Sequence, residues 1–155
     1  TSLYNRTTAR KMIEAYMEST KKGKIGAYLY LDLDDFKQMN DANGRTFCDR
    51  VLTKFAGIIS NNIRNDDIAA RIGGDEFIIF FKDMVNETVV NRQIERLFEA
   101  LQTSLEEQDC SISIGVSLYP RDGEDLKTLE DHADQALYQA KNMGKNQYFI
   151  YESEQ

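Results

Sequence analysis

The sequence predicts an α+β fold of the ferredoxin-like type, with a central mixed antiparallel sheet covered by helices. Helix-like and strand-like segments follow one another in the order α-β-α-β-β-α-β-α-β. Strand-like segments at residues 68–72 and 77–81 flank the turn Gly73-Gly74-Asp75-Glu76, which is typical of a hairpin. A hairpin combined with helices that connect other strands favours an α+β architecture over a doubly wound parallel sheet.

The helices and the remaining strands are predicted from hydrophobic periodicity. Apolar residues recur at helical spacing over four segments, which are residues 9–16, 51–63, 90–105 and 126–140. Residues 25–31 are almost continuously apolar, as in a buried central strand, residues 112–118 alternate, and residues 148–151 form a terminal strand. With 155 residues and no linker or repeat, residues 1–155 are expected to form a single domain.

The amino-acid composition indicates which partners the protein can bind and in which compartment it is located. The chain has 26 acidic and 19 basic side chains and a net charge of −7, which argues against a nucleic-acid partner. No apolar stretch approaches the roughly 20 residues needed to span a bilayer, so no membrane contact is expected from this chain. The only cysteines, Cys48 and Cys110, lack the spacing of a zinc site and indicate a reducing, cytoplasmic location.

Acidic residues are predicted to gather at one end of the sheet. Asp32 and Asp34 point the same way at the end of a strand, and Asp75 and Glu76 could face them from a neighbouring strand. Such a cluster repels itself unless a proton or a cation intervenes, and oxygen ligands favour Mg²⁺. The alternative is a solvated hairpin tip beside an acidic strand end, because acidic turns are common on protein surfaces.

Four sequence blocks resemble one known family. The block Arg71-Ile72-Gly73-Gly74-Asp75-Glu76-Phe77 looks like the signature of the GGDEF family of diguanylate cyclases. Residues 31–41, 113–116 and 133–146 resemble its other blocks in the right order. The resemblance implies a nucleotidyl-cyclase-like palm and an enzyme that condenses two GTP into cyclic di-GMP plus two pyrophosphate. It also implies Mg²⁺ as cofactor, with Mn²⁺ as a possible substitute, and a homodimer, since each chain would hold one GTP.

The resemblance also assigns roles to individual residues. It makes Asp32, the backbone carbonyl of Leu33, Asp75 and Glu76 the metal ligands, with Asp75 as the candidate base. The family's catalytic and triphosphate-holding cations correspond to Lys37, Lys141 and Lys145. Taken alone, a lysine on a helix is more often a solvated charge.

Two further pairs match the family's nucleotide sites. Asn40 and Asp49 match the positions that recognise guanine, and an amide and a carboxylate suit the edge of that base. Without the resemblance, Asn40 reads as a helix cap or turn residue and Asp49 as a helix N-terminal acid. Arg64 and Asp67 match the family's inhibitory Arg-x-x-Asp site for the product, and the alternative there is a surface ion pair.

Three positions depart from the family pattern. Arg45 stands where histidine is usual, Cys48 where glycine is usual and Lys145 where arginine is usual. A side chain at Cys48 is expected to crowd the guanine pocket or to need a φ angle that glycine takes freely. The alternatives are therefore a degenerate module that binds GTP or cyclic di-GMP and signals through a partner, and a structural dimerisation domain. Because the chain starts like the end of the family's opening motif, it is expected to be excised from a longer signalling protein.

Overall fold

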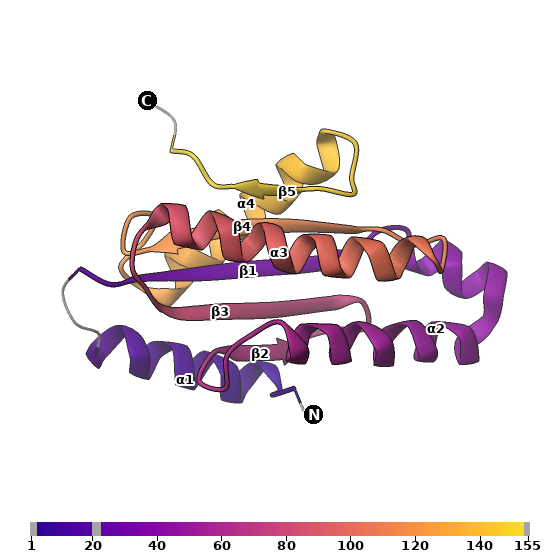
Figure 1. The fold of residues 1–155 in the computed structure, drawn as a ribbon, viewed down its shortest axis with the longest axis horizontal. Helices are drawn as coiled ribbons and strands as arrows, with labels where there is room; N and C mark the ends of the chain where they lie inside the picture. The colour runs from indigo at the N-terminus through magenta and orange to yellow at the C-terminus, as the bar shows by residue number, and fades with distance from the viewer. Residues whose placement is uncertain (1–2, 20–22, 154–155) are drawn as a thin grey trace.

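A computed structural model describes residues 3–19 and 23–153 of the chain (Figure 1). Within these residues the order of elements is the predicted one, with four helices and five strands. The elements are α1 (Arg6–Ser19), β1 (Ile25–Leu33), α2 (Phe36–Asn61), β2 (Ile68–Arg71), β3 (Glu76–Met84), α3 (Glu87–Glu106), β4 (Ile112–Tyr119), α4 (Leu126–Asn142) and β5 (Tyr148–Ile150). None of the described helices is both long and apolar enough to cross a membrane.

The five strands form one sheet in the order β2-β3-β1-β4-β5. β1 pairs antiparallel with β3 and with β4, and β2 pairs antiparallel with β3. Only β5 pairs parallel, with β4, and this pair makes the sheet mixed. The predicted α+β class with a mixed sheet is therefore confirmed, and β1 occupies the centre, as its apolar sequence predicts.

Helices cover both faces of the sheet (Figure 1). One core lies between the sheet and helices α2 and α3, where Leu29 and Leu31 of β1 are buried. The second core lies against α1 and α4 and buries Tyr28 on the opposite face of the same strand. Burial of each large apolar side chain contributes about 1.5–3 kcal/mol, so the two cores fix the position of β1 from both sides.

Helix α4 approaches β4 at Gly115. A Cβ atom at this position would lie 2.1 Å from the carbonyl oxygen of Ala133, which no side chain tolerates. Asp125 caps the start of α4 by accepting a hydrogen bond from the amide of Thr128. This close contact places the C-terminal turn of α4, which carries Lys141, over the end of the central strands.

Helix α2 is longer than predicted and is kinked. Its backbone leaves the helical region at Gly44, with φ 83° and ψ 166°, so two helical pieces meet there. The sequence predicted only the second piece, because residues 36–43 are mostly polar and their apolar residues, chiefly Phe36 and Met39, are too few to show a helical period. Asn40 therefore lies inside a helix and not at a cap or turn.

Candidate active site

The predicted acidic residues meet where β1 ends and β3 begins. In the β1–β3 pairing Asp32 lies directly opposite Glu76. The amide of Leu33 donates to the backbone carbonyl of Asp75 at 3.1 Å, which ties the hairpin turn to the end of β1. The sheet register therefore places Asp32, Asp75 and Glu76 at one site.

Asp32 is buried, and its charge is only partly compensated. One carboxylate oxygen, Oδ2, pairs with the side-chain amine of Lys141 from α4. The other, Oδ1, is buried and has no hydrogen-bond partner among the described residues. Burial raises the pKa of Asp32 to about 6; the ion pair with Lys141 opposes this rise, and the neighbouring carboxyl of Asp75 adds to it.

Two side chains hold the turn and its acid in place. Arg71 donates to the backbone carbonyls of Gly73 at 3.0 Å and Gly74 at 2.9 Å. The hydroxyl of Tyr30 donates to Glu76 Oε2 at 2.7 Å. Sequence reasoning missed Tyr30, although its spacing of two residues from Asp32 places it on the same face of the strand.

Asp34 directly follows β1, and its carboxylate is occupied by structural hydrogen bonds. It accepts bonds from the hydroxyls of Ser111 and Ser113, each at 2.6 Å, and from the amide of Asn146 at 3.0 Å. The expectation that it joins a cation-binding cluster is therefore corrected: Asp34 fastens β1 to β4 and to the loop after α4.

The other residues predicted to bind the nucleotide, Lys145, Lys37 and Asn40, lie in the loop after α4 and in the first piece of α2. Lys145 follows α4 and pairs with Asp35 at 2.7 Å. Lys37 and Asn40 lie on the exposed first piece of α2, and their side chains make no hydrogen bond or ion pair with other described residues. Their side chains are therefore accessible to a ligand.

Asp49 lies in a groove that reaches the hairpin. The groove has a volume of about 640 Å³, and Leu3, Arg71 and Phe77 also line it. This volume lies within the range of small-molecule sites in proteins. Cys48 is 2% exposed, has helical backbone angles and does not line this groove, so the glycine-like φ expected at this position is not observed.

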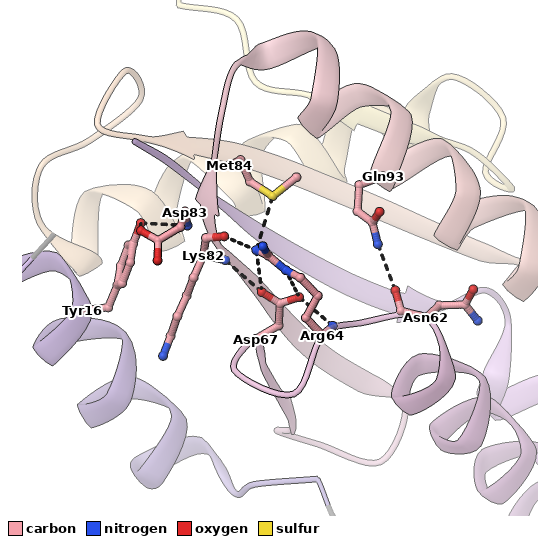
Figure 2. A network of polar contacts seen from close by, with 8 residues as sticks. All are labelled: Tyr16, Asn62, Arg64, Asp67, Lys82, Asp83, Met84 and Gln93. Carbon is pink, nitrogen blue, oxygen red and sulfur yellow. Dashed lines mark hydrogen bonds and ion pairs between the residues drawn. The ribbon is translucent and has the colours of Figure 1, made fainter. Parts of the chain in front are cut away.

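Arg64 and Asp67 lie near Lys82, six residues along β3 from Glu76 (Figure 2). Asp67 is 5% exposed and accepts hydrogen bonds from the backbone amides of Arg64 at 2.9 Å and Lys82 at 3.0 Å. The guanidinium of Arg64 contacts Asp67, the carbonyl of Lys82 and the sulfur of Met84. The Asp67 carboxylate therefore joins the segment after α2 to β3, whereas the Arg64 side chain remains half exposed.

The acidic site has some of the features that a divalent cation needs. No group of three carboxylate, imidazole or thiol side chains in the described residues is arranged as a metal cage. The partnerless Asp32 Oδ1 and the adjacent carboxyl of Asp75 nevertheless leave negative charge uncompensated. Hard oxygen ligands of this kind suit Mg²⁺, which takes a few protein ligands and completes its shell with phosphates and water.

A comparison with known families agrees with the motifs. Residues 1–147 match the family described as "Diguanylate cyclase, GGDEF domain". The chain belongs to the GGDEF family. GGDEF domains generally use a divalent metal and are typically nucleotidyl cyclases.

Curated relatives of this GGDEF domain are longer proteins. The chain is 36% identical to the bifunctional diguanylate cyclase/cyclic di-GMP phosphodiesterase MucR of Pseudomonas aeruginosa, across 99% of this chain and 23% of MucR. It is 34% identical to the cyclic di-GMP phosphodiesterase PdeR of Escherichia coli, across 99% of this chain and 24% of PdeR. The chain thus spans about a quarter of these relatives.

Solved GGDEF domains have the same fold. The domain of YfiN (TpbB) from Pseudomonas aeruginosa superposes with a TM-score of 0.86 at 27% identity, covering 99% of each chain. The active GGEEF domain of a Vibrio cholerae diguanylate cyclase gives 0.84 at 27% identity, covering 99% of this chain and 100% of that one. The domain of DgcB from Caulobacter crescentus, solved with cyclic di-GMP, gives 0.78 at 25% identity, covering 99% and 94%.

Proposed function

We propose that this GGDEF domain is a diguanylate cyclase that condenses two GTP into cyclic di-GMP and two pyrophosphate. The observation that carries the proposal is the convergence of Asp32, Asp75 and Glu76 at one end of the sheet, with Asp32 Oδ1 buried and without a partner. A purely structural dimerisation domain would have no use for this uncompensated charge. The curated relative MucR is named as a diguanylate cyclase.

The acidic residues would hold Mg²⁺ or Mn²⁺. The ligands are Asp32, the carbonyl of Leu33, Asp75 and Glu76. A cation bound there would neutralise charge on the phosphates and on the group transferred between the two nucleotides. Asp75 accepts the proton of the attacking ribose 3′-hydroxyl.

Basic residues around the acidic cluster would hold the triphosphate. Lys141 pairs with one oxygen of Asp32 in the free protein, which keeps its amine beside the acidic residues and supports a role in binding the phosphates. Lys145 adds a second cation, since its partner Asp35 is exposed and their pair is open to solvent. Lys37 is exposed on α2, where its amine stabilises charge that develops in the transition state.

The nucleotide base and the product have separate sites in this proposal. Asn40 and Asp49 recognise guanine, and the groove beside Asp49 leads to the turn through Arg71. Arg64 and Asp67 bind cyclic di-GMP as an inhibitor. Two domains must meet as a homodimer, because the product contains two identical bonds and each chain holds one GTP. The domain acts in the cytoplasm, where GTP and Mg²⁺ are available, as one part of a longer signalling protein.

A binding module without catalysis is the second candidate. The ion pair between Lys141 and Asp32 partly satisfies the acid without a metal. PdeR, whose name gives only phosphodiesterase activity, resembles the whole of this chain at 34% identity. Such a module would bind GTP or cyclic di-GMP and act on a partner.

An incubation with GTP and Mg²⁺, followed by chromatography for cyclic di-GMP and pyrophosphate, tests the proposal. Cyclic di-GMP from the parent is the expected result. The variants Asp75→Asn and Glu76→Gln should lose about 10³-fold or more of the rate, because each removes a metal-facing charge with little change in volume. GTP binding without product would favour the binding module, and a variant within tenfold of the parent would show that the ligands are misassigned.

A further inference from the structure

The carboxylate of Glu76 is held by a hydroxyl from the neighbouring strand. Tyr30 donates to Glu76 Oε2 at 2.7 Å. The bond runs diagonally across the β1–β3 pair, since Glu76 lies opposite Asp32 and Tyr30 lies opposite Ile78. Hydrogen bonds to an ionised carboxylate are among the stronger ones in proteins. One oxygen of Glu76 is therefore fixed in direction.

The second oxygen of Glu76 occupies space that a side chain at Gly73 would reach. A Cβ atom built on Gly73 would lie 3.1 Å from Glu76 Oε1. A contact this short is tighter than nearly all Cβ contacts, so any larger residue at this position would push the carboxylate aside. Tyr30 occupies Oε2, and no hydrogen bond to Oε1 is found among the described residues. Oε1 is therefore the oxygen of Glu76 that remains available to a ligand.

We infer that Tyr30 is a positioning residue: its hydroxyl binds one oxygen of Glu76 and directs the other toward the metal shared with Asp32 and Asp75. The inference rests on the proposed cyclase function and adds a residue to the site. Removing a residue that hydrogen-bonds a metal ligand, without contacting the metal itself, typically lowers the metal affinity by about 10–100-fold. Tyr30 acts only through Glu76, because no other hydrogen bond of its hydroxyl is found in the described chain.

Tyr28 provides a matched control on the same strand. It lies two residues earlier on the same face, and both tyrosines line one cleft of about 240 Å³ beneath α1 and α4. Tyr28 is 3% exposed, and its hydroxyl makes no hydrogen bond within the described residues. Tyr28→Phe therefore removes a hydroxyl from similar surroundings without touching Glu76.

The test measures Mn²⁺ binding directly by electron paramagnetic resonance, in the presence of a non-hydrolysable GTP analogue. Tyr30→Phe should bind Mn²⁺ about tenfold more weakly than the parent or Tyr28→Phe. Without metal, Tyr30→Phe should melt slightly below the parent because it removes the hydrogen bond to Glu76, whereas Tyr28→Phe should melt close to the parent. In a Glu76→Gln background, Tyr30→Phe should cause no further loss, because the ligand that Tyr30 orients is already gone.

The outcomes separate the inference from the proposed function. If the parent binds Mn²⁺ but Tyr30→Phe matches Tyr28→Phe, Tyr30 only fills space and the inference fails alone. Loss of Mn²⁺ affinity that persists in the Glu76→Gln background would also overturn it, since Tyr30 would then act by another route. Mn²⁺ binding without turnover contradicts the cyclase but still tests Tyr30, whereas a parent that binds no Mn²⁺ overturns both.

Discussion

The amine of Lys141 pairs with Asp32 Oδ2, while Asp32 Oδ1 beside it is buried without a hydrogen-bond partner in the described part of the chain. The two residues are 109 positions apart and are brought together by the packing of α4 on β4. One cation therefore compensates only half of a buried carboxylate, in a site that also contains the acid Asp75. An arrangement of this kind lowers stability in the absence of ligand.

Asp32→Asn should stabilise the metal-free protein at pH 8. The pKa of Asp32 is raised to about 6 in the folded chain, from about 3.9 in an unfolded one. Between these values the folded state holds a proton that the unfolded state has lost, so stability falls as pH rises through this window. Asn removes that loss, and we expect a gain of about 1–3 kcal/mol at pH 8 that disappears below about pH 4.

Thermal melts of parent and variant at both pH values, in buffer with a chelator, measure this difference. Added Mg²⁺ and GTP analogue should stabilise the parent and leave the Asn variant nearly unchanged. An Asn variant less stable than the parent at pH 8 would show that the ion pair with Lys141 outweighs the cost of burial.

Asp49→Ala should raise the KM for GTP and reduce the preference for GTP over ATP, each by about tenfold, because guanine's N–H groups lose their acceptor. The side chain lines the groove and is exposed, so the fold should not change. Arg50→Ala is the control, since Arg50 is an exposed neighbour that does not line the groove. Steady-state rates with both nucleotides test the assignment, which fails if the parent already uses ATP as well as GTP.

The sequence predicted the elements better than the contacts between them. Periodicity located α3 and α4 because each buries a regular apolar face, and a continuous apolar run located β1, which is buried on both faces. Periodicity missed the mostly polar first piece of α2, in which Phe36 and Met39 pack partly buried against the core and which ends at the break at Gly44.

In the site, too, the sequence predicted the residues better than the contacts between them. Motif resemblance named Asp32, Asp75 and Glu76, and the strand register explains why they meet. Neither motif nor spacing indicates that Lys141 reaches Asp32 or that Ser111 and Ser113 occupy Asp34. Those contacts depend on how α4 and β4 pack, which a single sequence does not specify residue by residue.

Specific activity should rise with protein concentration. Each chain offers one acidic cluster, and the 3′-hydroxyl of one GTP must reach the α-phosphorus of the other. Initial rates across a hundredfold range of concentration, paired with sedimentation analysis, measure the dependence. Rates strictly proportional to protein where only monomer is present would contradict a catalytic dimer.

Arg64→Ala should remove inhibition by cyclic di-GMP and leave the initial rate near that of the parent. The guanidinium is half exposed, so it can leave the carbonyl of Lys82 and bind a phosphate of the product. Arg64 contacts Lys82, which lies six residues along β3 from Glu76, so a product bound at Arg64 would act on β3 without occupying the GTP site. Coupling between two such sites is typically worth about 1–3 kcal/mol, so the inhibition curve should shift about 5- to 150-fold.

Asp67 is not a suitable position for testing inhibition alone, because its carboxylate also accepts hydrogen bonds from the backbone amides of Arg64 and Lys82 (Figure 2). Asp67→Ala leaves the amides of Arg64 and Lys82 without their acceptor and should lower the stability by about 1–3 kcal/mol, whereas Arg64→Ala should change it little. The role of this site in inhibition is therefore tested with the variants Arg64→Ala and Arg64→Lys. Progress curves at several GTP and cyclic di-GMP concentrations measure the inhibition of each protein. Lys keeps the charge without the two-pronged contact and should restore inhibition only in part. Equal, GTP-competitive inhibition of the parent and Arg64→Ala would reduce this pair to a structural link between the segment after α2 and β3.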